Sequence, residues 1–194
     1  MADANSWSWI FIILTVVLLL AALAAVFFFS GKRGVRKAAM RVDESWDGVK
    51  ANVRKRAALV DEMSEALEQH APHEADVAGQ ARQKAEQSRD ANPTELSEVD
   101  AELRTSVRRI VQVAGGYPNL SRDREFLQLQ SELGRVEQDI QTGRRFYNGA
   151  VREYNTRIST FPGSMAARGD TYGKREFFEA NDRAAIAEPP RVQF

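Results

Sequence analysis

Residues 7–29 are WSWIFIILTVVLLLAALAAVFFF, and this stretch decides the architecture of the chain. It carries no charge, and only Ser8 and Thr15 interrupt its apolar character. A helix of this length, at about 1.5 Å per residue, reaches about 35 Å and can cross a hydrocarbon core of about 30 Å with some tilt. We therefore expect residues 1–30 to be a transmembrane anchor.

A cleaved signal peptide is the competing interpretation of the N-terminus. The alanines at 21, 22, 24 and 25 could mimic a small-residue cleavage site. A signal peptide, however, starts with basic residues and has an apolar stretch of roughly 7 to 15 residues. Here residues 1–5 hold no base and the apolar run is longer. We expect the span to be retained.

Basic residues follow the span directly and predict its orientation. Before the first acid, Asp43, the chain places Lys32, Arg33, Arg36, Lys37 and Arg41, whereas only Asp3 lies on the other flank. The positive-inside bias then predicts a single-pass protein of the cell membrane, with its N-terminus outside and most of the chain cytoplasmic. Residues 31–41 also form a basic juxtamembrane segment, whose side chains are candidate contacts for anionic lipid headgroups.

Beyond the anchor, apolar residues recur at helical spacing and predict an all-α chain. Four helices are expected, at about 35–69, 73–89, 93–113 and 121–161. The first either continues straight out of the span or hinges at Gly31 and Gly34. Asn92 and Pro93 are typical of a helix start, and the run Gly115-Gly116-Tyr117-Pro118 is typical of a helix end. Trp46 is expected to lie opposite Gly149 and Ala150.

The lengths and breaks predict how these helices assemble. The helix at 121–161 repeats its apolar residues over five heptads, which favours packing against an antiparallel neighbour. Short breaks between helices predict an elongated antiparallel up-and-down four-helix bundle over residues 35–162. Residues 163–194 are expected to be an irregular tail that packs on the bundle, with Phe177 and Phe178 over the seam between the two long helices.

Composition excludes several kinds of chemistry. Cysteine is absent, which rules out disulfides and thiolate sites, and 27 basic residues balance 27 acidic ones, which argues against nucleic-acid binding. No phosphate-binding loop, serine-hydrolase elbow or di-iron motif occurs. His70 and His73 flank Pro72 in a turn, so we interpret them as a solvated loop rather than as zinc ligands. We predict no catalytic, cofactor-binding or metal-binding residue.

Two patterns are candidate partner-binding sites. Tyr147-Asn148 and Tyr154-Asn155 repeat at an interval of seven, so they form either a polar groove for a partner or, as we favour, buried tyrosines and register-fixing asparagines. The tail offers Phe177, Phe178, Val192 and Phe194. Its last residues either pack on the bundle, which we favour, or form a free recognition peptide that adds a strand to a partner's sheet.

An ordered set of residues resembles the LemA family of bacterial membrane-anchored helical proteins. Its strongest stretch runs from Phe126 to Pro162 through Glu137, Tyr147-Asn148 and Tyr154-Asn155, with further matches at Trp46, Arg56, Leu59-Val60, His73-Glu74, Ala81-Arg82, Tyr117-Pro118, Phe177-Phe178-Glu179-Ala180, Pro190, Val192 and Phe194. The resemblance implies one N-terminal span and a four-helix bundle, and it implies no established enzymatic activity. This chain departs from the family at Asp61-Glu62-Met63, where Pro-Asn followed by an apolar residue is usual.

Together these features predict a noncatalytic scaffold or adaptor at the inner membrane. Its expected partners are membrane lipid and an unidentified envelope protein. One alternative is an enzyme or accessory factor in membrane proteolysis, which would require a buried, convergent set of ionisable groups. Another is a membrane-organising protein that forms homo-oligomers, for which Ala21 and Ala25 provide a small-residue pair in the span.

Overall fold

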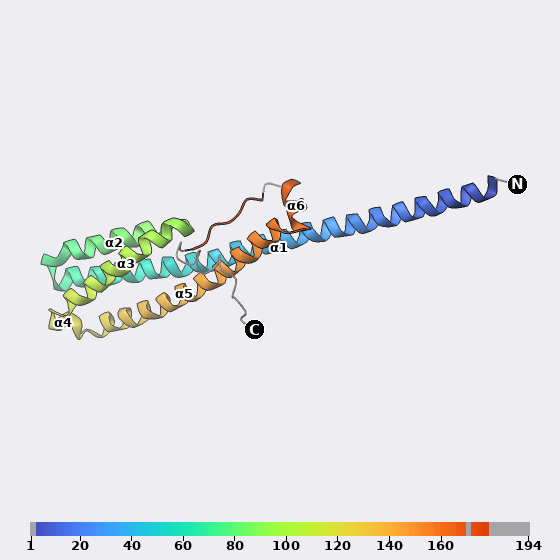
Figure 1. The fold of residues 1–194 in the computed structure, drawn as a ribbon. Coiled ribbons are helices and arrows are strands. Elements are labelled where there is room, and N and C mark those ends of the chain that lie inside the picture. The colour runs from blue at the N-terminus through green and yellow to red at the C-terminus, as the bar shows by residue number, and fades with distance from the viewer. Residues whose placement is uncertain (1–2, 170–171, 179–194) are drawn as a thin grey trace, which may run out of the picture. The chain divides into compact units, whose positions relative to one another are not determined.

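The computed structural model describes residues 3–169 and 172–178, and every regular element in these ranges is helical (Figure 1). In chain order the elements are α1 (Asp3–His70), the 3-10 turn η1 (Pro72–Glu74), α2 (Ala75–Arg89), α3 (Pro93–Ala114), α4 (Pro118–Ser121), α5 (Arg124–Ser159) and α6 (Gly163–Gly169). The predicted all-α class and the long apolar N-terminal helix are confirmed.

Of the two forms expected for the first helix, the structure has the continuous one. α1 runs without a break from Asp3 to His70, so Gly31 and Gly34 do not form a hinge. Both glycines instead allow close approach to a neighbour. A Cβ added at Gly31 would lie 3.3 Å from Pro162, and one added at Gly34 would lie 3.1 Å from the guanidinium of Arg157.

Helix ends follow local capping chemistry. Asn92 caps α3, accepting bonds from the backbone amides of Thr94 and Glu95 while the Glu95 carboxylate accepts from the amide of Asn92. The predicted start of α3 is therefore confirmed. The predicted start of the last helix is wrong, because Ser121 closes α4 and Asp123 caps α5 by accepting from the amide of Phe126 at 2.9 Å.

The chain divides into two compact units. The first comprises residues 1–41 and 152–175, so it contains the start of α1, the end of α5 and all of α6, with no part of α2 or α3. Val35, Ala38 and Tyr154 are buried in it. Arg41 on α1 pairs with Glu153 on α5 at 3.1 Å.

The second unit comprises residues 42–151 and, from the tail, residues 176–178 of the described range. Its core takes apolar side chains from the rest of α1 and from α2, α3 and α5, among them Val49, Val60, Leu67, Ala81, Leu103, Ile110, Leu133 and Ile140. In Figure 1, α2 and α3 lie side by side. Three alanines of α2 that are fully buried, Ala78, Ala81 and Ala85, allow that close packing.

Ion pairs connect the helices of the second unit at defined positions. Glu68 of α1 pairs with Arg82 of α2 at 3.1 Å, and Asp61 of α1 pairs with Arg89 of α2 at 2.5 Å. Lys84 of α2 meets Glu102 of α3 at 2.5 Å. Between α1 and α5 the approach is close enough that a Cβ on Gly143 would lie 3.1 Å from the side chain of Val49.

Candidate functional site

In the second unit, Tyr147 and Asn148 of α5 hold the backbone of the C-terminal segment. Asn148 Nδ2 donates to the carbonyl oxygen of Phe178, and the amide of Phe178 donates back to Asn148 Oδ1, each at 2.9 Å. The hydroxyl of Tyr147 donates to the carbonyl oxygen of Glu176, also at 2.9 Å. Because Tyr147 and Asn148 are buried, these bonds form in a site where an unmade bond is costly.

In the first unit, Tyr154 and Asn155 make the same kind of contact one repeat later. The Tyr154 hydroxyl donates to the carbonyl oxygen of Gly173 at 3.0 Å. Asn155 binds both backbone groups of Arg175, donating to its carbonyl oxygen and accepting from its amide at 2.9 Å. Each Tyr-Asn pair therefore binds three backbone groups of the tail.

The repeat length explains why the pattern occurs twice. Asn148 and Asn155 are seven residues apart on α5, about 10.5 Å along a helix axis. Their ligands Phe178 and Arg175 are three residues apart, about 10 Å in an extended chain. The ligand of the Tyr-Asn repeat is the chain's own segment 173–178.

Phe178 is the side chain that this arrangement buries. It is 1% exposed, and its ring centroid lies 6.3 Å from that of Trp46. Trp46 also lies 5.2 Å from the ring of Tyr147. Trp46 was expected opposite Gly149 and Ala150. A Cβ added at Gly149 would meet nothing within 4 Å, so the indole does not pack on Gly149. The indole instead packs beside Phe178.

The other tail candidates differ from Phe178. Phe177 is half-buried. Val192 and Phe194 lie outside the described residues. Of the tail, residues 173–178 are held by their backbone groups and by the buried ring of Phe178.

Five basic residues that follow the apolar run lie on α1 with exposed side chains, namely Lys32, Arg33, Arg36, Lys37 and Arg41. Arg41 is engaged by the Glu153 carboxylate, which also binds Arg157 at 2.9 Å. The hydrogen bond from Arg157, with the charges of both arginines, holds the pKa of Glu153 below its usual value.

Charge is divided unevenly between the two units. The sequence ranges of the first unit hold ten basic and three acidic residues, so they carry a formal charge of +7. The ranges of the second unit hold the remaining 17 basic and 24 acidic residues and carry −7. The formal charges of the two units cancel, so the zero net charge of the whole chain does not reveal this division.

An acidic groove of about 460 Å³ lies between α1 and α5 in the second unit. Five acids line it without a lysine or arginine among its lining residues, namely Glu62, Glu65, Asp123, Glu125 and Glu132. Phe126 and Leu129 supply apolar surface to the same groove. The groove therefore combines negative charge with apolar surface.

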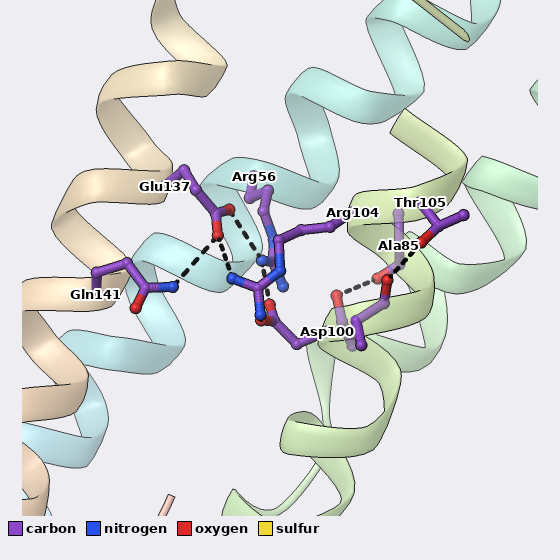
Figure 2. Close-up of polar contacts among 9 residues, drawn as sticks. Arg56, Ala85, Asp100, Arg104, Thr105, Glu137 and Gln141 are labelled. Atoms are coloured by element: carbon purple, nitrogen blue, oxygen red, sulfur yellow. Dashed lines mark hydrogen bonds and ion pairs between the residues drawn. The ribbon is translucent and has the colours of Figure 1, made fainter. Parts of the chain in front are cut away.

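A cluster of opposite charges lies where α1, α3 and α5 meet, and its Arg56 and Asp100 are buried (Figure 2). Arg56 and Asp100 are each 1% exposed and form a short ion pair. Glu137 accepts from Arg56 at 3.2 Å and from Arg104 at 3.2 Å, and Arg104 reaches the second oxygen of Asp100 at 2.6 Å. Two guanidinium groups thus neutralise two carboxylates.

Sequence reasoning missed this cluster, although a signal exists. Three charged residues of the cluster interrupt apolar stripes at helical spacing: Arg56 between Val53 and Val60, Asp100 between Leu96 and Leu103, and the half-buried Glu137 between Leu133 and Ile140. Three such interruptions by residues of opposite charge indicate an internal network, since buried charges require partners. Which charges meet depends on the register between helices, which the sequence alone does not give.

A cavity of about 280 Å³ adjoins the cluster between α3 and α5. Leu103, Val107 and Leu133 give it an apolar wall, and Arg56, Arg104 and Glu137 form its charged side. Nε and Nη2 of Arg56 are buried without a hydrogen-bond partner among the described residues. The cluster therefore contains two buried nitrogen donors of Arg56 that make no hydrogen bond to a described residue.

His70 and His73 are both exposed, and Nδ1 of His70 lies 2.9 Å from the carbonyl oxygen of Ala66 on its own helix. Within the part of the chain that the structure describes, no three His, Cys, Asp or Glu side chains converge as metal ligands.

The family model of the LemA family matches residues 45–194. No curated protein matches the chain.

Proposed function

Because this chain belongs to the LemA family, we propose that it is a noncatalytic scaffold or adaptor of the bacterial inner membrane. In this proposal the first unit is held in lipid, and the second unit presents an acidic surface to a protein. The observation that carries the proposal is the division of charge between the two units: the unit that contains the apolar helix is strongly basic, and the unit that contains the groove is strongly acidic.

The start of α1 is the proposed anchor. Large apolar side chains from Phe11 to Phe29, such as Leu18, Leu20 and Leu23, are 50% or more exposed. A soluble protein rarely exposes so large an apolar surface, and acyl chains would cover it. The exposed bases that follow support an orientation with the N-terminus outside and the bundle in the cytoplasm.

We propose that residues 42–151 form an antiparallel up-and-down four-helix bundle. Two registers support opposite directions for neighbouring helices. Moving back along α1 from Glu68 to Asp61 corresponds to moving forward along α2 from Arg82 to Arg89. Likewise, Arg56 of α1 meets Glu137 of α5, and the earlier Val49 meets the later Gly143.

The proposed partner surface is the acidic groove that Glu62, Glu65 and Glu132 help to line. Its charge favours a basic partner segment and repels anionic headgroups, so it selects protein over lipid. The basic first unit has the opposite preference. The acidic second unit would thus bind the protein partner, and the basic first unit would bind the lipid.

A pull-down of the intact chain from mild detergent tests the adaptor role. The groove variant carries Glu62→Gln, Glu65→Gln and Glu132→Gln, and the control variant carries Glu44→Gln, Glu98→Gln and Asp139→Asn at exposed positions outside the groove. Wild type and control should recover the same protein, and the groove variant should lose it. Equal recovery by all three, or no reproducible partner, contradicts the proposal.

The buried cluster favours a second candidate, a role in membrane proteolysis. Arg56, Asp100, Arg104 and Glu137 are the convergent ionisable set that such a role requires, and a cavity adjoins them. The chemistry argues against catalysis, because arginine stays protonated and both carboxylates are already occupied by guanidinium groups. Asp100→Asn separates the candidates: a catalytic role predicts loss of substrate turnover in a variant that remains folded, and a structural role predicts loss of stability.

A further inference from the structure

A bend between α5 and α6 places apolar side chains beside the proposed span. In the first unit the ring of Phe161 stacks on that of Phe27, with centroids 5.7 Å apart and planes inclined by 21°. Phe161 is nevertheless 67% exposed, and Met165 at the start of α6 is 55% exposed. These two side chains, with Pro162 between them, are called the corner below.

The contacts of the corner fix its depth along α1. Phe27 is two residues before the last apolar residue of the span, Phe29, or about 3 Å along the helix. It precedes the first base, Lys32, by five residues, or about 7.5 Å. Pro162 packs at the level of Gly31. The corner therefore lies where the apolar run gives way to bases.

The turn that forms the corner requires a glycine at position 163. A Cβ on Gly163 would lie 2.2 Å from the carbonyl oxygen of Arg157 and 3.2 Å from Val35, so only glycine permits this turn. The turn brings Phe161 onto the apolar run and leaves most of its ring uncovered. Phenylalanine is among the apolar side chains that segments lying at a membrane surface bury at the boundary between headgroups and acyl chains.

Charge around the corner suits anionic lipid. Lys32, Arg33, Arg36 and Lys37 are exposed on α1, and Arg168 is exposed on α6. Glu153 is the only acid among the described residues after Asp3 in this unit, and it is paired with Arg41 and Arg157. An apolar tip surrounded by bases is the pattern of interfacial membrane contacts.

We infer that the corner is a second membrane contact, in which Phe161 and Met165 insert among acyl chains of anionic phospholipids in the cytoplasmic leaflet. The inference rests on the proposed anchor and adds to it. A single helix can rotate about its axis, whereas a helix with a lateral contact presents one fixed face to the bilayer. The corner would therefore orient the chain as well as hold it.

The absence of native cysteine makes a direct test possible. Single cysteines replace Leu18, Phe146, Phe161 or Met165 in the full chain, and each carries an NBD fluorophore. The variants are placed in nanodiscs of equal phosphatidylglycerol and phosphatidylcholine, with or without phospholipid that carries a nitroxide quencher on its acyl chain. Phe146 is the matched control, since it is an exposed phenylalanine of α5, fifteen residues before Phe161.

The expected result is loss of NBD emission at 18, 161 and 165 and no loss at 146. Quenching at 18 without quenching at 161 and 165 overturns the corner contact and leaves the anchor intact. No quenching at 18 overturns the anchor itself. A blue-shifted but unquenched probe at 161 indicates protein rather than lipid around the corner, as in a second copy, and also overturns the inference.

Replacement of the native side chains gives an independent readout. With the probe kept at Met165, Phe161→Ser should weaken quenching there, and Phe146→Ser should leave it unchanged. Since Phe161 is largely exposed, its replacement should leave the fold of the chain intact. Equal quenching at 165 in both variants would contradict a lipid contact that depends on Phe161.

Discussion

The side chain of Asn148 forms hydrogen bonds with both backbone groups of Phe178. It donates to the carbonyl oxygen and accepts from the amide, each at 2.9 Å. A carboxamide can replace a strand neighbour in this way because it presents a donor and an acceptor side by side. An α-helix thereby holds an extended peptide without a sheet. The contact depends on asparagine, since neither leucine nor aspartate offers both functions.

Asn148→Ala should release the tail more readily than Asn155→Ala. Asn148 is 5% exposed, so its loss leaves buried backbone groups unpaired at a cost of about 1–3 kcal/mol. Asn155 makes the same bonds at an exposed position, where water can replace them. Hydrogen exchange of the peptide that contains residues 173–178 should accelerate most in Asn148→Ala. Equal acceleration in both variants, or an effect of the exposed control Asn119→Ala, would contradict this explanation.

Phe178→Ala should destabilise the second unit, and Phe177→Ala should have little effect. A buried phenylalanine replaced by alanine typically costs about 3–5 kcal/mol, with the cost limited here by the free energy that docks the tail. Trp46 emission reports the change, measured in a Trp7→Phe, Trp9→Phe background because the chain has three tryptophans. A red shift for Phe178→Ala alone is expected. The same shift for Phe177→Ala would show that the burial of Phe178 is not what shields Trp46.

Arg56→Met alone should be strongly destabilising, by about 3–5 kcal/mol, because it leaves Asp100 buried with less compensation. Adding Asp100→Leu should recover most of that loss, since Arg104 and Glu137 still pair with each other at 3.2 Å. Chemical unfolding of the detergent-solubilised chain measures both effects. Arg54→Met is the control, because Arg54 is exposed and its contact with Asp90 is 3.6 Å long. An Arg56→Met variant as stable as the control would show that the buried pair contributes no net stability.

Local signals in the sequence predict the features that depend on local chemistry. The apolar run, the Asn92 cap and the helix end at Gly115 are each decided within a few residues, and all three appear as predicted. The sequence alone does not distinguish whether Gly31 and Gly34 bend the helix or allow another segment to pack closely against it. Their neighbours, Pro162 and Arg157, are more than 120 residues away in the chain, so only the fold distinguishes the two roles.

The candidate sites show the same difference between features that depend on local sequence and features that depend on the fold. Periodicity identifies the Tyr-Asn repeat, yet its ligand is a tail that has no periodicity of its own. The charged cluster needs the register of three helices at once, because Arg56, Asp100 and Glu137 approach one another only if α1, α3 and α5 align. The sequence shows that each of these charged residues interrupts an apolar stripe. It does not show which of them pair with one another.

Stability of the first unit should fall in acid through Glu153. Its folded pKa lies below the ordinary value of 4.5, chiefly because Arg157 donates a hydrogen bond to it. The contribution of this carboxylate is therefore complete above about pH 4.5 and is lost as pH falls through the lowered pKa. Glu153→Gln should be less stable than wild type at neutral pH and equal to it in strong acid. A difference that persists unchanged in acid would assign the effect to packing rather than to charge.

Gly163→Ala should disrupt the bend between α5 and α6, and Gly149→Ala should not disturb the chain. A Cβ at Gly163 would come within 2.2 Å of the carbonyl oxygen of Arg157, so the backbone must move. At Gly149 a Cβ meets nothing within 4 Å, and alanine there should stabilise α5 by up to about 1 kcal/mol. Thermal unfolding of the full chain, with proteolysis near Arg168, compares the two variants. If Gly163→Ala melts and resists protease as wild type does, the bend tolerates a side chain, and glycine is not what brings Phe161 against Phe27.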